Sequence, residues 1–378
     1  MTLEEDNHLV LLDAMCAKSE HAGVLEYCRH NSLDHFGYLL SKGNANVEFH
    51  RYFAAKIAGG KDDEEAKSEP YRYRIKLLCN WMGSAGIAAL WQKLFPRVGD
   101  GDIQLELILD DSDNDADLWV IVNSPAGSPD IAYIAERTIV VQMEPHMSGN
   151  PSQWGWEWSS PDPSKFLAVL SHESGHNNLE WHLEKNLDEL LSGADEDIPK
   201  SKGVSAVLSA KYSDPGHKKR VDLVRYLDDY GVEVDVYGAV GNEFTWARYC
   251  GSLPYHAKEA GLVPYAYHVT AENHAIPNYF TEKIVDAILC ESLCFYWGCP
   301  NLDEYLPQDC YIRLSSGRTR EDLEADASMI AKSIADNEHE KRLPAIKEAK
   351  RRILNEMLLF HRIKSLVLQN KILPRIKE

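Results

Sequence analysis

The chain has 378 residues, and its 40 lysines and arginines against 59 aspartates and glutamates give a net charge of −19. At roughly 150 residues per domain, this length predicts two or three domains. So acidic a protein is not expected to bind the nucleic-acid backbone in general, because phosphate contacts need a basic surface. The sequence contains no run of about eighteen apolar residues, and its N-terminus lacks the basic and apolar parts of a signal peptide. We therefore expect no membrane span and a cytoplasmic location.

Residues 1–69 are predicted to form a helical prefix and a linker, because apolar residues recur at helical spacing before a glycine-led charged run. From residue 70 short apolar runs alternate with a helical stretch. The expected strands are 73–79, 103–109, 118–122 and 138–143, and the expected helix is 87–95. This alternation is typical of a parallel α/β sheet.

A second unit of the same kind follows residues 150–200, which read as aromatic-rich, then helical, then acidic and loop-like. Its expected strands are 204–210, 232–237, 266–271 and 293–297, and its expected helices are 217–230 and 281–290. The remaining C-terminal residues alternate charged with apolar positions and are expected to be helical. The sequence therefore predicts two α/β domains, 70–199 and 200–325, between the prefix (1–69) and a helical tail (326–378).

The eight cysteines are expected to be free thiols. Disulfides are rare in the cytosol, and Cys290, Cys294, Cys299 and Cys310 include no CxxC pair. Two of the four lie in apolar surroundings that are typical of core positions. We expect no metal site among them.

His172, Glu173 and His176 match the HExxH pattern of zinc hydrolases, in which two histidines one helical turn apart bind zinc and the glutamate polarises a water. His182 follows at the spacing of a third ligand. Leu179 stands where a glycine should turn the chain toward that ligand, and no candidate Met-turn follows. A zinc hydrolase is kept as an alternative, and we expect no metal at this motif.

The run DSDNDAD at residues 111–117 resembles the start of an EF-hand loop. Ala116 occupies the sixth position, where that loop needs glycine, and Val122 occupies the twelfth, where it needs a bidentate glutamate. The run also contains the Asp-x-Asp pattern of metal-dependent sugar transferases. We interpret it as an acidic loop between two strands that could hold only a weak, non-essential divalent cation.

The most informative segment is 266–298, which reads as strand, turn, helix and strand. Thr281 stands where the helix should begin, and the free N–H groups and dipole of a helix attract phosphate there. A lysine in the first turn opposes the dipole, so Lys283 suggests a bound diphosphate. Glu282 suits the acceptance of hydrogen bonds from ribose hydroxyls. The alternative is a Thr-capped surface helix with an exposed Glu-Lys pair.

This segment resembles the signature of the family 10 α-1,3-fucosyltransferases. The likeness runs through Ala271-Glu272-Asn273, Tyr279-Phe280-Thr281-Glu282-Lys283 and Phe295-Tyr296-Trp297-Gly298, with Ala271 where the family usually has phenylalanine. It continues upstream in Arg220-Val221, VDVYG at 234–238, VVQMEPHMS at 140–148, NWMG at 80–83 and NSP at 123–125. The resemblance covers residues 72–315 and is stronger in the second half.

The resemblance implies a GT-B fold, in which two Rossmann-like domains face a cleft, and GDP-fucose as the donor, with inversion at the anomeric carbon. It implies that Glu144 is the general base, a task that suits a carboxylate whose pKa burial has raised. It implies that Arg220 and Lys283 contact the diphosphate and stabilise the charge that builds on the leaving GDP without a metal. Lys218 and Lys219 extend Arg220 into a local basic cluster, which favours an anion site.

Other positions match the family around the donor. Lys218 is expected to share the phosphate contacts, and Glu282 is expected to hold the ribose. Asn273 and Tyr279 are expected to orient the fucose. Glu272 could either stabilise positive charge on the sugar or support the end of its strand.

Trp154, Trp156 and Trp158 alternate shortly after Glu144. Aromatic faces pack against the CH groups of sugars, so Trp154 and Trp156 are expected to contribute to an acceptor-binding wall. The alternative is a partly buried loop.

We therefore predict an inverting fucosyltransferase that moves L-fucose from GDP-fucose to a glycan hydroxyl, with α-1,3 linkage and no required cofactor. The alternatives are a related GT-B transferase that uses another GDP-sugar, the zinc hydrolase, and a non-catalytic protein that binds sugar nucleotides. The expected partners are the donor and a glycan acceptor. The prefix and the tail could serve a homodimer or bind a partner protein.

Overall fold

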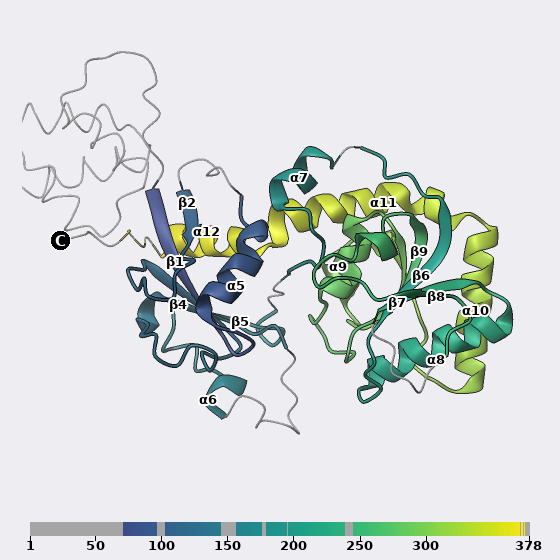
Figure 1. Ribbon diagram of the computed structural model, residues 1–378, viewed down its shortest axis with the longest axis horizontal. Coiled ribbons are helices and arrows are strands. Elements are labelled where there is room, and N and C mark those ends of the chain that lie inside the picture. Colours follow the sequence, from purple (N-terminus) through teal and green to yellow (C-terminus); the bar gives the residue numbers. More distant parts are fainter. Residues whose placement is uncertain are drawn as a thin grey trace, which may run out of the picture. The chain divides into compact units, whose positions relative to one another are not determined.

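The computed structural model describes residues 71–96, 103–144, 156–175, 179–194, 196–238, 245–370, 372 and 374. The prefix predicted for residues 1–69 lies outside these ranges. Tyr71–Val367 belongs to one compact unit that contains two parallel sheets (Figure 1). In the described part of the chain, no helix is long and apolar enough to cross a membrane.

The first sheet has five parallel strands in the order β2-β1-β3-β4-β5. They are β1 (Tyr71–Cys79), β2 (Ile103–Leu107), β3 (Leu118–Val122), β4 (Thr138–Val141) and β5 (Ala168–Leu170). Every residue of β3 and β4 is buried, as expected of central strands covered on both faces. Helix α5 (Ser84–Trp91), followed by a 3-10 turn (Gln92–Leu94), packs on β1. In a doubly wound sheet of order 2-1-3-4-5, ligands bind at the carboxyl ends of the strands where the order reverses, here between β1 and β3.

The second sheet has six parallel strands in the order β11-β10-β9-β6-β7-β8. They are β6 (Lys202–Leu208), β7 (Val234–Gly238), β8 (Tyr249–Gly251), β9 (Tyr265–Ala271), β10 (Leu293–Trp297) and β11 (Tyr311–Arg313). Read from β8, this is the Rossmann order 3-2-1-4-5-6, which reverses between β6 and β9. Helix α8 (Pro215–Tyr230) contacts β6, β7 and β9, and helix α9 (Glu282–Leu289) contacts β9 and β10.

Local sequence explains where α8 and α9 begin. Pro215 occupies the first position of α8, where its missing N–H costs no hydrogen bond. Gly231 ends the same helix at a φ of 88°, a left-handed conformation that favours glycine. Thr281 caps α9, because its side chain accepts a hydrogen bond from the backbone N–H of Lys283. These ends place the first turns of both helices at the carboxyl edge of the second sheet.

The described part of the tail is mostly helical, as predicted. Its elements are α10 (Arg320–Ala335), α11 (Glu338–Arg352), a π-helical turn (Ile353–Met357) and α12 (Leu359–Gln369). On the second sheet's side, Lys350 forms a buried ion pair of 2.8 Å with Glu291, directly after α9. In α12, the ring of Phe360 packs edge-on against Phe95, with 6.1 Å between the ring centroids. The tail therefore packs on elements of both sheets.

The helix predicted within residues 150–200 is wrong for most of its length. Described residues 160–175 and 179–186 form turns, loops and strand β5, and only α6 (Trp156–Ser159) and α7 (Leu187–Ser192) are helical there. Strands β5, β8 and β11 were not predicted, whereas β3 and β10 have the predicted bounds. The remaining short elements are 3-10 turns at Ala135–Arg137, Glu259–Gly261, Leu302–Glu304 and Gln308–Cys310.

Candidate functional site

At the reversal point of the first sheet, polar residues after the strands orient the backbone of Glu144. Asn80 follows β1 and Asn123 follows β3. Asn123 Nδ2 donates to Asn80 Oδ1 at 3.1 Å, and Asn123 Oδ1 accepts from the backbone N–H groups of Met143 (2.8 Å) and Glu144 (3.3 Å). Asn123 has a φ of 60°, a conformation that asparagine tolerates better than most residues. One amide therefore fixes the segment that carries Glu144.

The surroundings of Glu144 favour its protonated form. Burial raises the pKa of the Glu144 carboxyl, and the carboxylates of Glu282 and Glu180 add to this effect. The ammonium groups of Lys283 and Lys211 act in the opposite direction. Glu144 thus lies within electrostatic reach of the first turn of α9. A raised pKa makes the ionised carboxylate a stronger base, which suits the task of a general base.

Arg220 lies at the reversal point of the second sheet and is only 5% exposed. Its Nη1 donates to the carbonyl of Ala271, at the end of β9, at 3.0 Å, and its Nη2 donates to Ser209 Oγ, just after β6, at 3.3 Å. Its Nε is buried without a hydrogen-bond partner among the described residues. An unpaired buried donor is costly, so this N–H group is available to a bound anion.

The first turn of α8 closes onto the loop after β9. The backbone N–H of Gly216 donates to the carbonyl of Asn273 at 3.0 Å. A β-carbon at Gly216 would lie 1.6 Å from the carbonyl oxygen of Glu272, so only glycine allows this approach. In the described structure, Asn273 Oδ1 is buried without a hydrogen-bond partner. The loop therefore carries an unsatisfied acceptor two residues beyond the carbonyl that holds Arg220.

Glu272 is fully buried and holds the start of α9. It accepts hydrogen bonds from the backbone N–H of Thr281 (2.9 Å), the hydroxyl of Thr281 (2.6 Å) and the hydroxyl of Tyr296 (3.3 Å). Burial raises the pKa of Glu272, and Lys283, whose Nζ is 3.6 Å away, opposes that shift. These contacts fit the strand-end support that the sequence left open.

Lys283 and Glu282 form an ion pair at the first turn of α9. Lys283 Nζ lies 3.1 Å from Glu282 Oε1, and it donates to Thr281 Oγ1 at the same distance. Burial lowers the pKa of Lys283, but the charges of Glu282 and Glu272 outweigh it and raise the pKa above its usual value. For Glu282, burial is likewise outweighed by Lys283 and Lys258, so its pKa lies well below the usual range. Both groups are therefore held in their charged forms.

Tyr279 is 5% exposed and packs edge-on against the ring of His172, with 6.3 Å between centroids. Burial raises its pKa well above the usual value, and the charges of Glu272 and Glu144 add to this. The tyrosine thus stays neutral, and it lies within electrostatic reach of both predicted carboxylates.

The basic cluster predicted on α8 is divided by the structure. Lys219 is buried, and its ammonium forms a 2.7 Å ion pair with Asp326 of α10 and donates to the carbonyl of Gly317 at 2.6 Å. The prediction that Lys219 joins the anion site is therefore wrong, because successive residues on a helix point in different directions. Lys218 is partly exposed, and Arg220 lies at the sheet edge.

The predicted acceptor tryptophans lie largely outside the described structure. Trp154 is outside the described residues, and so is the side chain of Trp156, whose backbone begins α6. Trp158 packs against Phe166, with 6.0 Å between ring centroids, and borders the core of the first sheet. It fits the alternative of a partly buried segment.

The HExxH segment does not form the helix that a zinc hydrolase needs. Residues 171–175 form a turn, and Gly175 has a φ of 71°. The carbonyl of His172 accepts a hydrogen bond from Asn278 Nδ2 at 2.8 Å. His176 lies outside the described residues, and His182 lies beside Glu180 at 3.3 Å. The turn removes the geometric basis of the zinc interpretation.

The acidic loop at 111–117 closes around cations of the chain itself. Lys76, fully buried in β1, donates to the backbone carbonyls of Asp110 (2.7 Å), Asp113 (2.8 Å) and Asp111 (3.2 Å). Arg74 forms ion pairs with Asp113 and with Asp115, the latter at 2.8 Å. The Lys76 ammonium thus forms hydrogen bonds with backbone carbonyl oxygens, a kind of oxygen that coordinates the ion in a calcium-binding loop.

The six cysteines within the described residues are free thiols, as predicted. Five of them are buried, and Cys250 is exposed. Burial raises the pKa of Cys299 to about 11, so its thiol is unreactive near neutral pH.

Three residues near the site were not predicted: Ser209, Glu180 and Lys258. Ser209 had a local signal, because it follows an apolar strand at the carboxyl edge. Glu180 and Lys258 lie in irregular segments whose sequence shows no periodicity, so only the fold brings them to α9.

Known proteins resemble this chain in sequence and in structure. Residues 198–338 match the family model described as glycosyltransferase family 10 (fucosyltransferase), C-terminal. An α1,3-fucosyltransferase crystal structure is 15% identical and has a TM-score of 0.49, over 84% of this chain and 94% of that one. An α-glucosyltransferase solved with UDP-glucose and DNA containing an abasic site is 10% identical and has a TM-score of 0.52, over 79% of this chain and all of that one. No curated protein matches the sequence.

Two doubly wound parallel sheets with the strand orders described above make up a GT-B fold, which the α-glucosyltransferase with the TM-score of 0.52 also has. This confirms the predicted fold. Residues 198–338 match the C-terminal domain of glycosyltransferase family 10, the family whose signature the motifs of this segment resemble.

Proposed function

We propose that this enzyme transfers L-fucose from GDP-fucose to a hydroxyl of a glycan acceptor, with inversion and α-1,3 linkage. One observation carries the proposal: Glu144, a carboxyl with a raised pKa at the first sheet, lies within electrostatic reach of Lys283, and Lys283 lies at the carboxyl edge of the second sheet, as does the unpaired Nε of Arg220. A base and an anion site are the two groups that an inverting transfer from a nucleoside diphosphate needs. The match to the fucosyltransferase family supports fucose as the sugar.

In this proposal the second sheet holds the donor. Arg220 and Lys283 bind the diphosphate, and Lys218 contributes from the exposed side of α8. Glu282 accepts hydrogen bonds from the ribose, for which its depressed pKa keeps it ionised. The buried Oδ1 of Asn273 accepts a hydrogen bond from a fucose hydroxyl, which would satisfy it.

The reaction then follows from the charges. Glu144 removes the proton of the acceptor hydroxyl as that oxygen forms a bond to the anomeric carbon. The bond from this carbon to the β-phosphate oxygen breaks on the opposite face, which inverts the configuration. The negative charge on the departing GDP increases during this step. Arg220 and Lys283 are already in place, so they stabilise the transition state more than the ground state.

The test is transfer of labelled fucose to a panel of glycans by the purified full chain, with GDP binding measured in parallel. Glu144→Gln should lower transfer about 10²–10⁴-fold and leave GDP affinity unchanged. Glu136→Gln, an exposed change on the same domain, is the matched control. Full activity of Glu144→Gln would remove the assigned base. Turnover of another GDP-sugar in place of GDP-fucose would overturn the donor, and GDP binding without any turnover would leave a binding protein.

A further inference from the structure

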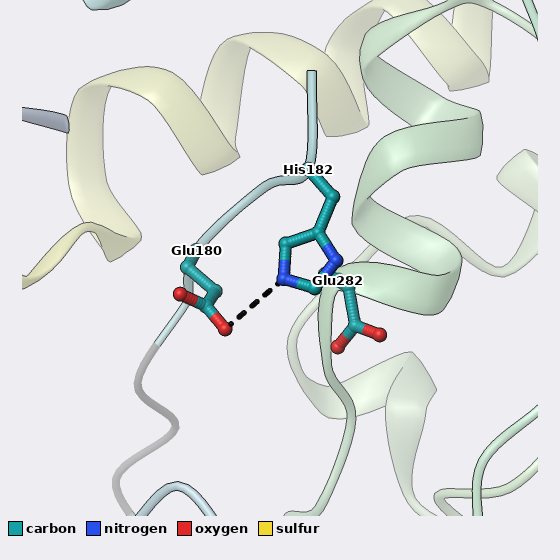
Figure 2. A group of neighbouring side chains, drawn as sticks. All are labelled: Glu180, His182 and Glu282. Carbon is teal, nitrogen blue, oxygen red and sulfur yellow. Dashed lines mark hydrogen bonds and ion pairs between the residues drawn. The ribbon is translucent and has the colours of Figure 1, made fainter. Parts of the chain in front are cut away.

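Two carboxylates and an imidazole converge at the edge of the proposed donor site, which shares Glu282 with this group. Glu180 and His182 precede α7, and Glu282 begins α9. One ligand atom of each lies within 4.8 Å of the other two, and Figure 2 shows the His182 ring between the two carboxylates. His182 Nε2 is 3.3 Å from Glu180 Oε1. The group is distinct from the HExxH motif and from the acidic loop.

The protein holds both residues of the irregular segment in place. Glu180 Oε2 accepts a hydrogen bond from Trp91 Nε1 of α5 at 2.9 Å. The backbone N–H of His182 donates to Asp286 Oδ1 of α9 at 2.8 Å. These contacts leave Glu180 Oε1 and the imidazole facing each other. Ligands anchored by neighbouring groups in this way are typical of metal sites.

The charge of Glu180 is the feature that calls for a cation. The residue is 8% exposed, and among the described residues its side chain contacts the neutral Trp91 indole and the His182 ring. Within the same part of the chain, no lysine or arginine forms an ion pair with it. Lys93 lies within electrostatic reach, but its ammonium donates to the carbonyl of Leu183. A buried carboxylate without a cationic partner is costly, so a positive charge should accompany it.

We infer that Glu180, His182 and Glu282 bind a divalent first-row cation, such as Mn²⁺. Imidazole and carboxylates are the donors that such ions accept. Metal–ligand bonds of about 2.1 Å place neighbouring donor atoms roughly 3 Å apart, so the 3.3 Å between Glu180 and His182 already fits. Glu282 closes the site by a small side-chain movement, and the remaining coordination positions are open to water. The site does not depend on the proposed fucosyl transfer.

The cation competes with two ammonium groups for Glu282. Lys283 holds Glu282 Oε1 at 3.1 Å, and Lys258 lies 3.9 Å from the same oxygen. Lys258 has a closer partner in Asp286, at 2.9 Å, and Glu282 has a second oxygen. Binding is therefore weaker than at a site of three unpaired ligands.

The full chain is titrated with Mn²⁺ in about 0.15 M salt, where surface charges are screened. Binding is monitored by electron paramagnetic resonance. Nucleotide is omitted because diphosphates chelate the metal. One equivalent should bind, with a nitrogen coupling from the imidazole. Glu180→Gln and His182→Gln should each weaken binding about tenfold or more, and His182→Gln should abolish the nitrogen coupling. Asp115→Asn, in the acidic loop, is the control and should bind as the parent does.

Absence of stoichiometric Mn²⁺ binding would overturn the site. Undiminished binding in both variants would also overturn it, because the ion would then lie elsewhere. Thermal unfolding of the variants shows that they are folded. Failure of fucose transfer would not alter these outcomes, since the measurement uses neither donor nor acceptor.

Discussion

The carboxyl ends of the two sheets use opposite means to control a glutamate. At the first sheet, the neutral amides of Asn80 and Asn123 hold the backbone, and burial raises the pKa of Glu144. At the second sheet, Lys283 and Lys258 surround Glu282 and hold its pKa well below the usual range. Burial that outweighs the nearby ammonium groups favours the protonated form of Glu144, whereas ammonium groups that outweigh burial keep Glu282 ionised.

The difference assigns separate tasks to the two regions. A general base has to change its protonation state in each turnover, so a raised pKa is useful. A group that binds ribose or phosphate has to keep one charge state, so ion pairs are useful even though their burial is costly. The predictions below test this contrast.

The largest loss is expected from Arg220→Gln. The change removes the buried positive charge and the Nε donor, so transfer should fall about 10²–10³-fold, with weaker GDP binding. Steady-state kinetics and GDP calorimetry measure the two effects. Arg225→Gln, an exposed change on the same helix, should leave both unchanged. Near-normal kcat/KM in Arg220→Gln would show that the anion is bound elsewhere.

Lys219→Met, one position earlier, should affect stability instead. It leaves Asp326 buried without its partner at 2.7 Å, which costs about 3–5 kcal/mol. Urea unfolding measures the loss, and the second change Asp326→Leu should recover much of it because an apolar pair can replace a buried ion pair. The folded variant should bind GDP normally. Loss of GDP affinity with unchanged stability would restore Lys219 to the anion site.

Some features of the fold and of the site could be predicted from the sequence, whereas the different surroundings of Lys219 and Arg220 could not. Strands β3 and β10 were predicted to the residue because each is a continuous apolar run. The start of α9 was predicted because Thr281 is a cap and Glu282-Lys283 is unusual in a first turn. Lys219 and Arg220 look alike in the sequence, since Asp326, the partner of Lys219, follows 107 residues later.

Other features depend wholly on tertiary pairing. Strands β5, β8 and β11 have three residues each, too few for a period to be recognised, and they exist because a neighbouring strand pairs with them. Glu180 and His182 lie near Glu282, which follows His182 by 100 positions, only because the fold brings them together.

The pH profile should separate the two glutamates. The base must be ionised, so kcat/KM should fall about tenfold per pH unit below the raised pKa of Glu144. Glu180→Gln removes a carboxylate that raises this pKa, so the acidic limb should move to lower pH. Glu136→Gln should leave it in place. Glu282 is already ionised, so it should add no second limb to the profile in this range. An unchanged acidic limb in Glu180→Gln would mean that a group other than Glu144 titrates.

The smallest effect is expected from Lys218→Gln. Lys218 is partly exposed, and exposed charges contribute about 0.2–1 kcal/mol, so GDP affinity should weaken less than about fivefold. Raising the salt from about 50 to 200 mM should likewise cost only a few-fold, against the 10³–10⁵-fold of a protein with six to ten phosphate contacts. Calorimetry at both salt concentrations measures these changes. If Lys218→Gln weakened GDP affinity as much as Arg220→Gln, the exposed Lys218 would be a main contact of the diphosphate. Buried charge would then no longer distinguish the second sheet from the first.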